Sequence, residues 1–300
     1  AVADVEGAAP PGKLRLSLGK TGVEVRADHH AKLEALHAIA SAATGRAEPS
    51  AAERAADCFS LLARYSAACG AQLRGGGFHA ALHGECFDAL AADFGVTMEC
   101  FASPLNCRWP RFCSQFPDVD RPFGSVGSFF DEEGGFAFAE GSFEANPPFD
   151  EGVVARMERR MRRLLRGAQE GGRELCFVVI IPHWPDKSAG WAALRNSEFL
   201  ARHVRIPLRD HGYFEGAQHN KLKSQYRVAS FDTSVFWLQS SKARERWPVT
   251  DAKVARLKEA FRPKQKEDPS GSGGALAEGG AEGGRPAKRA RAAAAGAAPR

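Results

Sequence analysis

The sequence predicts an α/β protein in which a mostly parallel, doubly wound sheet follows an N-terminal helical subdomain. Beyond residue 95, short strand-like and helix-like segments alternate, and this succession favours a parallel sheet with helices on both faces. Residues 175–181 form a continuous apolar, β-branched run, which is typical of a strand buried on both faces. Binding sites in such sheets lie beyond the carboxyl ends of the strands.

The first 95 residues predict the helical subdomain. Its start, residues 1–12, is rich in small residues and is expected to be frayed. Alternating and helical spacings of apolar residues then predict strands at 14–18 and 23–25 and helices at 30–43, 50–65 and 84–94.

The sheet domain is expected from residue 96 to residue 262. Its predicted strands cover residues 96–102, 135–143, 175–181, 204–208 and 235–239, and a basic amphipathic helix is predicted at 151–165.

Residues 263–300 are rich in Gly, Ala, Ser, Pro and Glu, so we expect a disordered tail. The tail contains Lys288, Arg289 and Arg291 in a short basic cluster. Such a cluster is either a nuclear import signal or a solvated run of charge, and we expect a nuclear protein on the first interpretation.

Composition and charge set wide limits on the partner. Of 300 residues, 44% are hydrophobic and 26% are charged, which suffices for a packed core. The net charge of +5 fits a polyanionic partner without requiring one. No apolar stretch approaches the roughly 18 residues of a membrane span, and no signal-peptide pattern opens the chain. We therefore expect an intracellular protein without a membrane partner.

The seven cysteines never occur as Cys-x-x-Cys. Most lie inside apolar runs, which indicates buried, reduced thiols rather than zinc ligands. We therefore expect no metal site.

The segment Asn146-Pro147-Pro148-Phe149 directly follows a predicted strand. Two prolines remove two backbone donors and fix φ, so neither strand nor helix continues through them. The Asn146 side-chain oxygen and the Pro147 carbonyl can accept both hydrogens of an exocyclic amine while Phe149 stacks on its ring. This grip would free the amine lone pair for attack without a metal. The alternative is a plain strand-terminating turn.

A second candidate region could hold a methyl donor such as S-adenosylmethionine. The loop after the predicted strand 96–102 lacks a Gly-x-Gly, so close backbone approach would come from Ala102 and Ser103. Asp118 and Asp120 could bind ribose hydroxyls, and the Phe123-Gly124-Ser125 turn could face adenine. The alternative is a turn with two solvated aspartates. The full set of donor-binding candidates is Phe101, Ala102, Ser103, Pro104, Asn106, Asp118, Asp120, Phe123, Gly124 and Ser125.

With these residues in view, the chain resembles the phosphorylated-CTD-interacting-factor family of cap-specific mRNA adenosine-N6 methyltransferases. The similarity runs from about residue 55 to residue 262, in the order and spacing of the family. It is carried by residues 94–107, 116–120, 123–125, 141–149, 181–184, 211–213 and 216–219.

The resemblance implies a class I, Rossmann-like methyltransferase fold and S-adenosylmethionine as donor. It implies the N6 of a 2′-O-methyladenosine beside the cap, at the 5′ end of capped mRNA, as acceptor. Residues 146–149 would then be the target-adenine motif, and Gln218 and His219 would lie near the substrate. Basic residues after this loop, Lys221, Lys223 and Arg227, are candidates for phosphate contacts, or else belong to a solvated loop.

The chain departs from the family in three respects: it matches poorly before residue 55, it differs between Gly124 and Gly141, and it lacks a module. The family's best-known members carry a WW domain that binds the phosphorylated tail of RNA polymerase II, and no such module is recognised here, so we expect only a weak contact with that tail. Two other functions fit the residues: N6-adenine methylation of other RNA or DNA, and a catalytically silent adaptor with the same fold.

Overall fold

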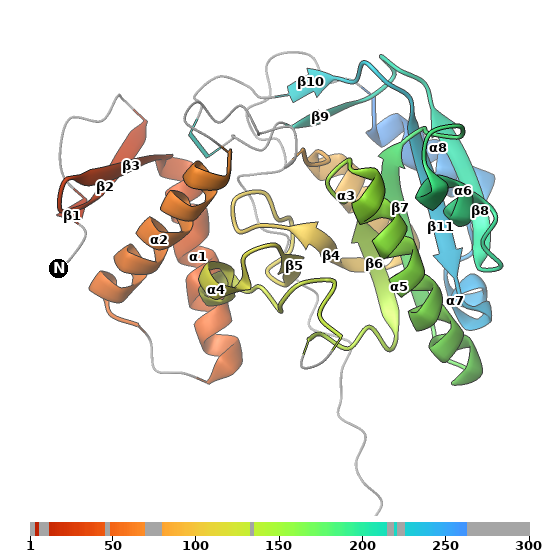
Figure 1. The fold of residues 1–300 in the computed structure, drawn as a ribbon, viewed down its shortest axis with the longest axis horizontal. Helices are drawn as coiled ribbons and strands as arrows, with labels where there is room; N and C mark the ends of the chain where they lie inside the picture. The colour runs from red at the N-terminus through yellow and green to blue at the C-terminus, as the bar shows by residue number, and fades with distance from the viewer. Residues whose placement is uncertain are drawn as a thin grey trace, which may run out of the picture.

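The computed structural model describes residues 4–5, 12–45, 49–69, 80–132, 135–214, 219–220 and 226–262 (Figure 1). The expected tail, residues 263–300, and Gln218, Lys221 and Lys223 lie outside these residues. Among the described helices, none combines the length and apolar character that a membrane crossing requires.

A mixed six-stranded sheet forms the centre of this α/β protein. Strands β5, β4, β6 and β7 are parallel, whereas β11 is inserted antiparallel between β7 and β8. The predicted parallel arrangement therefore holds except at β11. The strands are β4 (Val96–Ala102), β5 (Phe112–Ser114), β6 (Gly141–Ala145), β7 (Leu175–Pro182), β8 (Leu200–Ile206) and β11 (Thr233–Gln239).

Helices cover both faces of this sheet. On one face lie α5 (Glu151–Glu170) and α6 (Ala189–Arg195), with α5 in front of the strands in Figure 1. On the other lie α3 (Gly84–Phe94), α7 (Ser241–Arg246) and α8 (Asp251–Ala260). Fully buried β7 supplies Phe177 and Val179 to the first core and Val178 and Ile180 to the second, as its apolar run predicts.

An N-terminal layer lies beyond the β5 edge of the sheet, at the left of Figure 1. It packs onto that edge through α4 (Pro117–Asp120) and the 3-10 helix η2 (Arg121–Phe123). The predicted helix start at Ser50 is confirmed, because Ser50 and Glu53 cap each other reciprocally. The layer contains β1 (Asp4–Val5), β2 (Lys13–Leu18), β3 (Thr21–Arg26), α1 (Ala27–Thr44) and α2 (Ala51–Cys69).

Helix α3 was assigned from sequence to the N-terminal subdomain, yet it packs on the central sheet beside α8. The proposed boundary at residue 95 thus separates α3 from its subdomain partners α1 and α2, and the domain division stays a proposal.

Several predicted elements have different bounds in the structure. The strand expected at 135–143 begins only at Gly141, whose positive φ of 118° breaks an extended chain there. Before it, Phe136 and Phe138 pack their rings against Phe143 instead of pairing in the sheet. Helix α5 continues past residue 165 to Glu170, and β8 ends at Ile206 rather than at residue 208.

Candidate active site

A cavity of about 450 Å³ opens at the carboxyl ends of β4, β5 and β6. The chain proceeds from β4 to β5 on one side, and from β6 to β7 on the other, so β4 and β6 flank the point where the strand order reverses. Ligands of open α/β sheets bind in this crevice. The cavity is lined by Tyr65, Ala68, Ala80, Cys100, Phe101, Ala102, Asn106, Ser114, Gln115, Ser128, Phe129, Phe130, Asn146, Pro148 and Val153.

The amide of Asn146 is held in one orientation. Its Nδ2 donates a 2.8 Å hydrogen bond to the carbonyl oxygen of Ala80. Because a carbonyl oxygen can only accept, the amide oxygen must lie on the other side. That oxygen, Oδ1, is buried and has no hydrogen-bond partner within the described residues. A buried polar atom without a partner is costly, and Asn146 lines the cavity, so Oδ1 is the candidate acceptor for a ligand bound there.

The rest of the motif is divided between two environments. Pro148 lines the cavity beside Asn146, and Pro147 is buried. The ring of Phe149 packs edge-to-face against Tyr213 and Phe231, with centroids 5.9 and 5.7 Å away. The structure therefore places Phe149 in an aromatic cluster and not in the cavity lining.

A tight turn follows β4. The backbone N–H of Ser103 donates to Asn106 Oδ1 at 2.7 Å, and the Ser103 hydroxyl donates to the same oxygen at 2.9 Å. Phe101, Ala102 and Asn106 line the cavity, whereas Ser103 and Pro104 are not among its lining residues. The turn therefore fixes the position of the Asn106 side chain in the cavity lining.

Asp120 lies behind the cavity wall that α2 provides. It accepts a 2.9 Å hydrogen bond from the hydroxyl of Tyr65, which lines the cavity. Burial raises the pKa of the Asp120 carboxyl to about 6, and hydrogen bonds from Ser114 and Tyr65 oppose this rise only in part. A carboxyl with a raised pKa at the edge of a cavity is a frequent feature of functional sites.

The other donor-binding candidates lie outside the cavity lining. Asp118 is exposed and forms a 2.8 Å ion pair with Arg64. Phe123 is fully buried in the core of the N-terminal layer. Gly124 has φ +103°, and a Cβ there would lie 2.0 Å from the Pro110 carbonyl oxygen. The hydroxyl of Ser125 lies 2.7 Å from that of Ser114, so it contacts a lining residue.

Of the substrate-binding candidates, the structure describes His219 and Arg227. His219 is 2% exposed, and its carbonyl oxygen accepts a 2.7 Å hydrogen bond from the N–H of Arg26. Arg227 lies in β10 (Tyr226–Val228), which pairs with β9 (Gly212–Phe214). Neither residue lines the cavity.

Several lining residues escaped the sequence analysis. Tyr65 and Ala80 come from segments far from the motif along the chain, and nothing in their local spacing marks them as ligand contacts. Phe129 and Phe130 form an adjacent aromatic pair after a glycine-rich stretch, which is a signal that could have been used. Gln115 follows the short edge strand β5 and carries no such signal.

Comparison with known proteins adds to this geometry. A family described as "Phosphorylated CTD interacting factor 1 WW domain" matches residues 32–216. Two curated relatives are named "mRNA (2'-O-methyladenosine-N(6)-)-methyltransferase". The Homo sapiens protein is 37% identical over 214 residues, which are 70% of this chain and 29% of that protein. The Mus musculus protein is 36% identical over 205 residues, which are 67% of this chain and 28% of that protein. The chain thus spans less than a third of the length of these two relatives.

Proposed function

This chain belongs to the phosphorylated CTD interacting factor 1 family, and we propose that it methylates the N6 amine of an adenosine in RNA. Both curated relatives bear the name of an adenosine-N6 methyltransferase, which supports the reaction class. The cavity at the point where the strand order reverses supports the class I methyltransferase fold.

The observation that carries the proposal is the buried Oδ1 of the cavity-lining Asn146, which has no hydrogen-bond partner among the residues that the structure describes. An exocyclic aryl amine delocalises its lone pair into the ring and is therefore a weak nucleophile. An acceptor fixed by the protein binds one of its N–H groups, and the Pro147 carbonyl, which has no local strand partner, can bind the second. These contacts favour a tetrahedral nitrogen whose lone pair points at an electrophile. Preorganised polar groups of this kind act without reorganising during the reaction.

The cavity residues also fit the methyl donor that such a reaction needs. A volume of about 450 Å³ is in the range of small-molecule sites, and aromatic walls alternate with amide and hydroxyl groups. Asn106, Ser114 and Gln115 could hold the polar parts of S-adenosylmethionine, and Phe101, Phe129 and Phe130 its adenine ring. When bound, S-adenosylmethionine supplies an electrophilic methyl group on a positively charged sulfur.

The proposed acceptor is the 5′ end of capped mRNA, at a 2′-O-methyladenosine next to the cap. This follows the names of the relatives. A terminal adenosine is not stacked in a duplex, so its base can enter the cavity without the cost of base flipping. The family description also supports the phosphorylated tail of RNA polymerase II as a second partner. Capped mRNA is made in the nucleus, where RNA polymerase II acts, and Lys288, Arg289 and Arg291 are proposed to direct import there.

The test is methyl transfer from labelled S-adenosylmethionine to three short RNAs. They begin with capped 2′-O-methyladenosine, capped unmethylated adenosine and uncapped adenosine. We expect the first RNA to be the best substrate, with label recovered as N6-methylated adenosine. Equal rates on all three RNAs would contradict cap recognition while keeping the reaction. No transfer to any of them would overturn the proposed function.

A further inference from the structure

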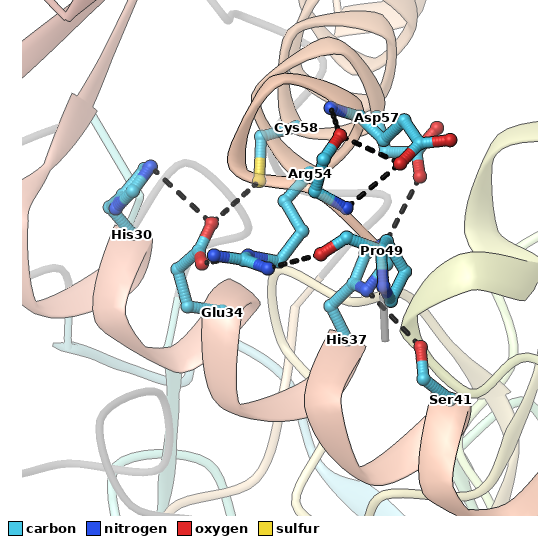
Figure 2. A network of polar contacts seen from close by, with 10 residues as sticks. His30, Glu34, His37, Ser41, Pro49, Arg54, Asp57 and Cys58 are labelled. Atoms are coloured by element: carbon cyan, nitrogen blue, oxygen red, sulfur yellow. Dashed lines mark hydrogen bonds and ion pairs between the residues drawn. The ribbon is translucent and has the colours of Figure 1, made fainter. Parts of the chain in front are cut away.

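Helices α1 and α2 meet along a polar seam (Figure 2). Two ion pairs satisfy most of this seam. Arg54 Nε lies 2.9 Å from Glu34 Oε2, and His37 Nε2 lies 2.9 Å from Asp57 Oδ2. Arg54 on α2 therefore already binds Glu34 on α1 through Oε2. The second carboxylate oxygen of Glu34 contacts other residues.

That second oxygen, Oε1, faces His30 and Cys58. His30 Nε2 and Cys58 Sγ each lie 4.0 Å from it, and the three atoms all lie within 4.8 Å of one another (Figure 2). A separation of 4.0 Å is too long for an N–H···O hydrogen bond, which spans about 2.7–3.2 Å. The Cys58 thiol makes only a long hydrogen bond to Oε1, so a nitrogen, an oxygen and a sulfur surround a common space with weak contacts among them.

We propose that His30, Glu34 and Cys58 bind a zinc ion that joins α1 to α2. Zinc accepts this mixture of imidazole, carboxylate and thiolate ligands, and it commonly takes three protein ligands with water in the fourth position. His30 and Glu34 are one helical turn apart on α1 and partly exposed, so water can reach the fourth position. Cys58 is completely buried on α2 and closes the site from the inside.

The distances are close to those of a zinc site. Zinc bonds of about 2.0–2.3 Å in a tetrahedron place the ligand atoms roughly 3.3–3.7 Å apart. Each ligand atom would need to move inward by only a few tenths of an ångström. Arg54 binds the non-coordinating oxygen of Glu34, which is the way that surrounding residues orient a metal-binding carboxylate.

The site also has a place in the architecture. Cys58 and Tyr65 are seven residues apart on α2, so they lie on the same face of the helix two turns apart. A metal bound at Cys58 would hold α2 in place, and α2 carries Tyr65, which is part of the cavity wall. Sequence spacing could not indicate this site, because its ligands come from two helices.

The experiment uses the full chain, stripped with a chelator and desalted, and does not depend on methylation. Cobalt(II) is added as a spectroscopic substitute for zinc, and zinc is then added in competition. We expect one equivalent of cobalt to give a near-ultraviolet thiolate-to-cobalt band, which zinc abolishes. Zinc at 100 times its dissociation constant should raise the melting temperature by about 5 °C.

Cys58→Ser should lose the thiolate band and the zinc-dependent rise in melting temperature. Cys69→Ser, at the last residue of the same helix, is the matched control and should retain both. His30→Asn changes a partly exposed ligand and should weaken zinc binding at least tenfold, so it tests the site even if Cys58→Ser fails to fold. The absence of a thiolate band in the wild-type protein would overturn the proposal. An undiminished band in Cys58→Ser would assign the metal to another cysteine and would also overturn it.

Discussion

The carbonyl oxygen of Ala80 accepts the amide hydrogen of Asn146 at 2.8 Å and thereby fixes which way the amide of this cavity-lining residue is turned. The two residues are 66 positions apart in the chain. The backbone before α3 therefore orients a side chain that follows β6. A catalytic interpretation of Asn146 depends on this contact, because the same amide turned over would present a donor where an amine needs an acceptor.

The first prediction tests this acceptor. Asn146→Ala removes Oδ1, so we expect methyl transfer to fall by about 10²-fold or more. The melting temperature should change little, because Asn146 lies on a loop after the strand and is not a core residue. Asn196→Ala, at the exposed end of α6, is the control and should retain activity. Near wild-type turnover in Asn146→Ala would show that the motif assignment is wrong.

The second prediction concerns Phe149, whose ring contacts Tyr213 and Phe231. The motif alone predicts an effect on turnover without one on stability, whereas this packing predicts a loss of stability as well. We expect Phe149→Ala to lower the free energy of unfolding by about 2 kcal/mol. Urea unfolding monitored by circular dichroism measures this change. Phe149→Leu keeps most of the apolar volume and should lose less; equal stability of all three proteins would contradict the packing argument.

The third prediction uses the raised pKa of Asp120, about 6 in the fold against an ordinary value of 3.8. Because the folded pKa is the higher one, ionisation costs the folded state stability. This cost is absent below about pH 4, grows between about pH 4 and pH 6, and is complete above that range. Asp120→Asn removes the charge and keeps an acceptor for Tyr65. Its melting temperature should therefore match or exceed that of the wild type at pH 7.5 and lose this part of the pH dependence.

The same variant separates structure from binding. If Asp120 contacts the donor, Asp120→Asn should raise the KM for S-adenosylmethionine even though the fold is not weakened. Asp118→Asn, which alters an exposed carboxylate two residues away, is the control and should change neither property. If Asp120→Asn has the wild-type KM for S-adenosylmethionine, Asp120 does not contact the donor, and its role is to position Tyr65.

The fourth prediction concerns Gly124. A Cβ at this position would lie 2.0 Å from the Pro110 carbonyl oxygen, and the φ of +103° strains any other residue. We expect Gly124→Ala to destabilise the protein by on the order of 3 kcal/mol. Gly84→Ala, at the start of α3, meets no atom of the described residues within 4 Å and should be neutral. Thermal unfolding compares the two, and an equally stable Gly124→Ala would contradict the geometry.

Local sequence patterns were sufficient to predict the strands whose own apolar residues indicate that they are buried. The apolar run of β7 and the exact span of β4 could be predicted because each strand is bounded by charge, glycine or proline. The reversed direction of β11 could not, because a strand buried on both faces has the same apolar pattern in either direction.

The candidate site shows the same division. Asn146 and Asn106 could be singled out because each follows a predicted strand, and the structure places both strands at the reversal of the sheet order. Tyr65 and Ala80 could not, because a helical tyrosine and a loop alanine acquire a role only when the N-terminal layer packs against the sheet. Conversely, Phe123 resembles a ligand contact in sequence, yet packing of the same layer buries it in the core.

Strand β8 forms one outer edge of the central sheet, and an outer strand can recruit a strand from another molecule. Arg202 and Arg205 lie along this edge and form ion pairs with Asp251 and Asp232. A second strand placed against this edge would have to desolvate these charged side chains, which opposes pairing. At the opposite end, the N-terminal layer covers the side of β5. The molecule therefore resists edge-to-edge polymerisation by charge at one side of the sheet and by steric cover at the other.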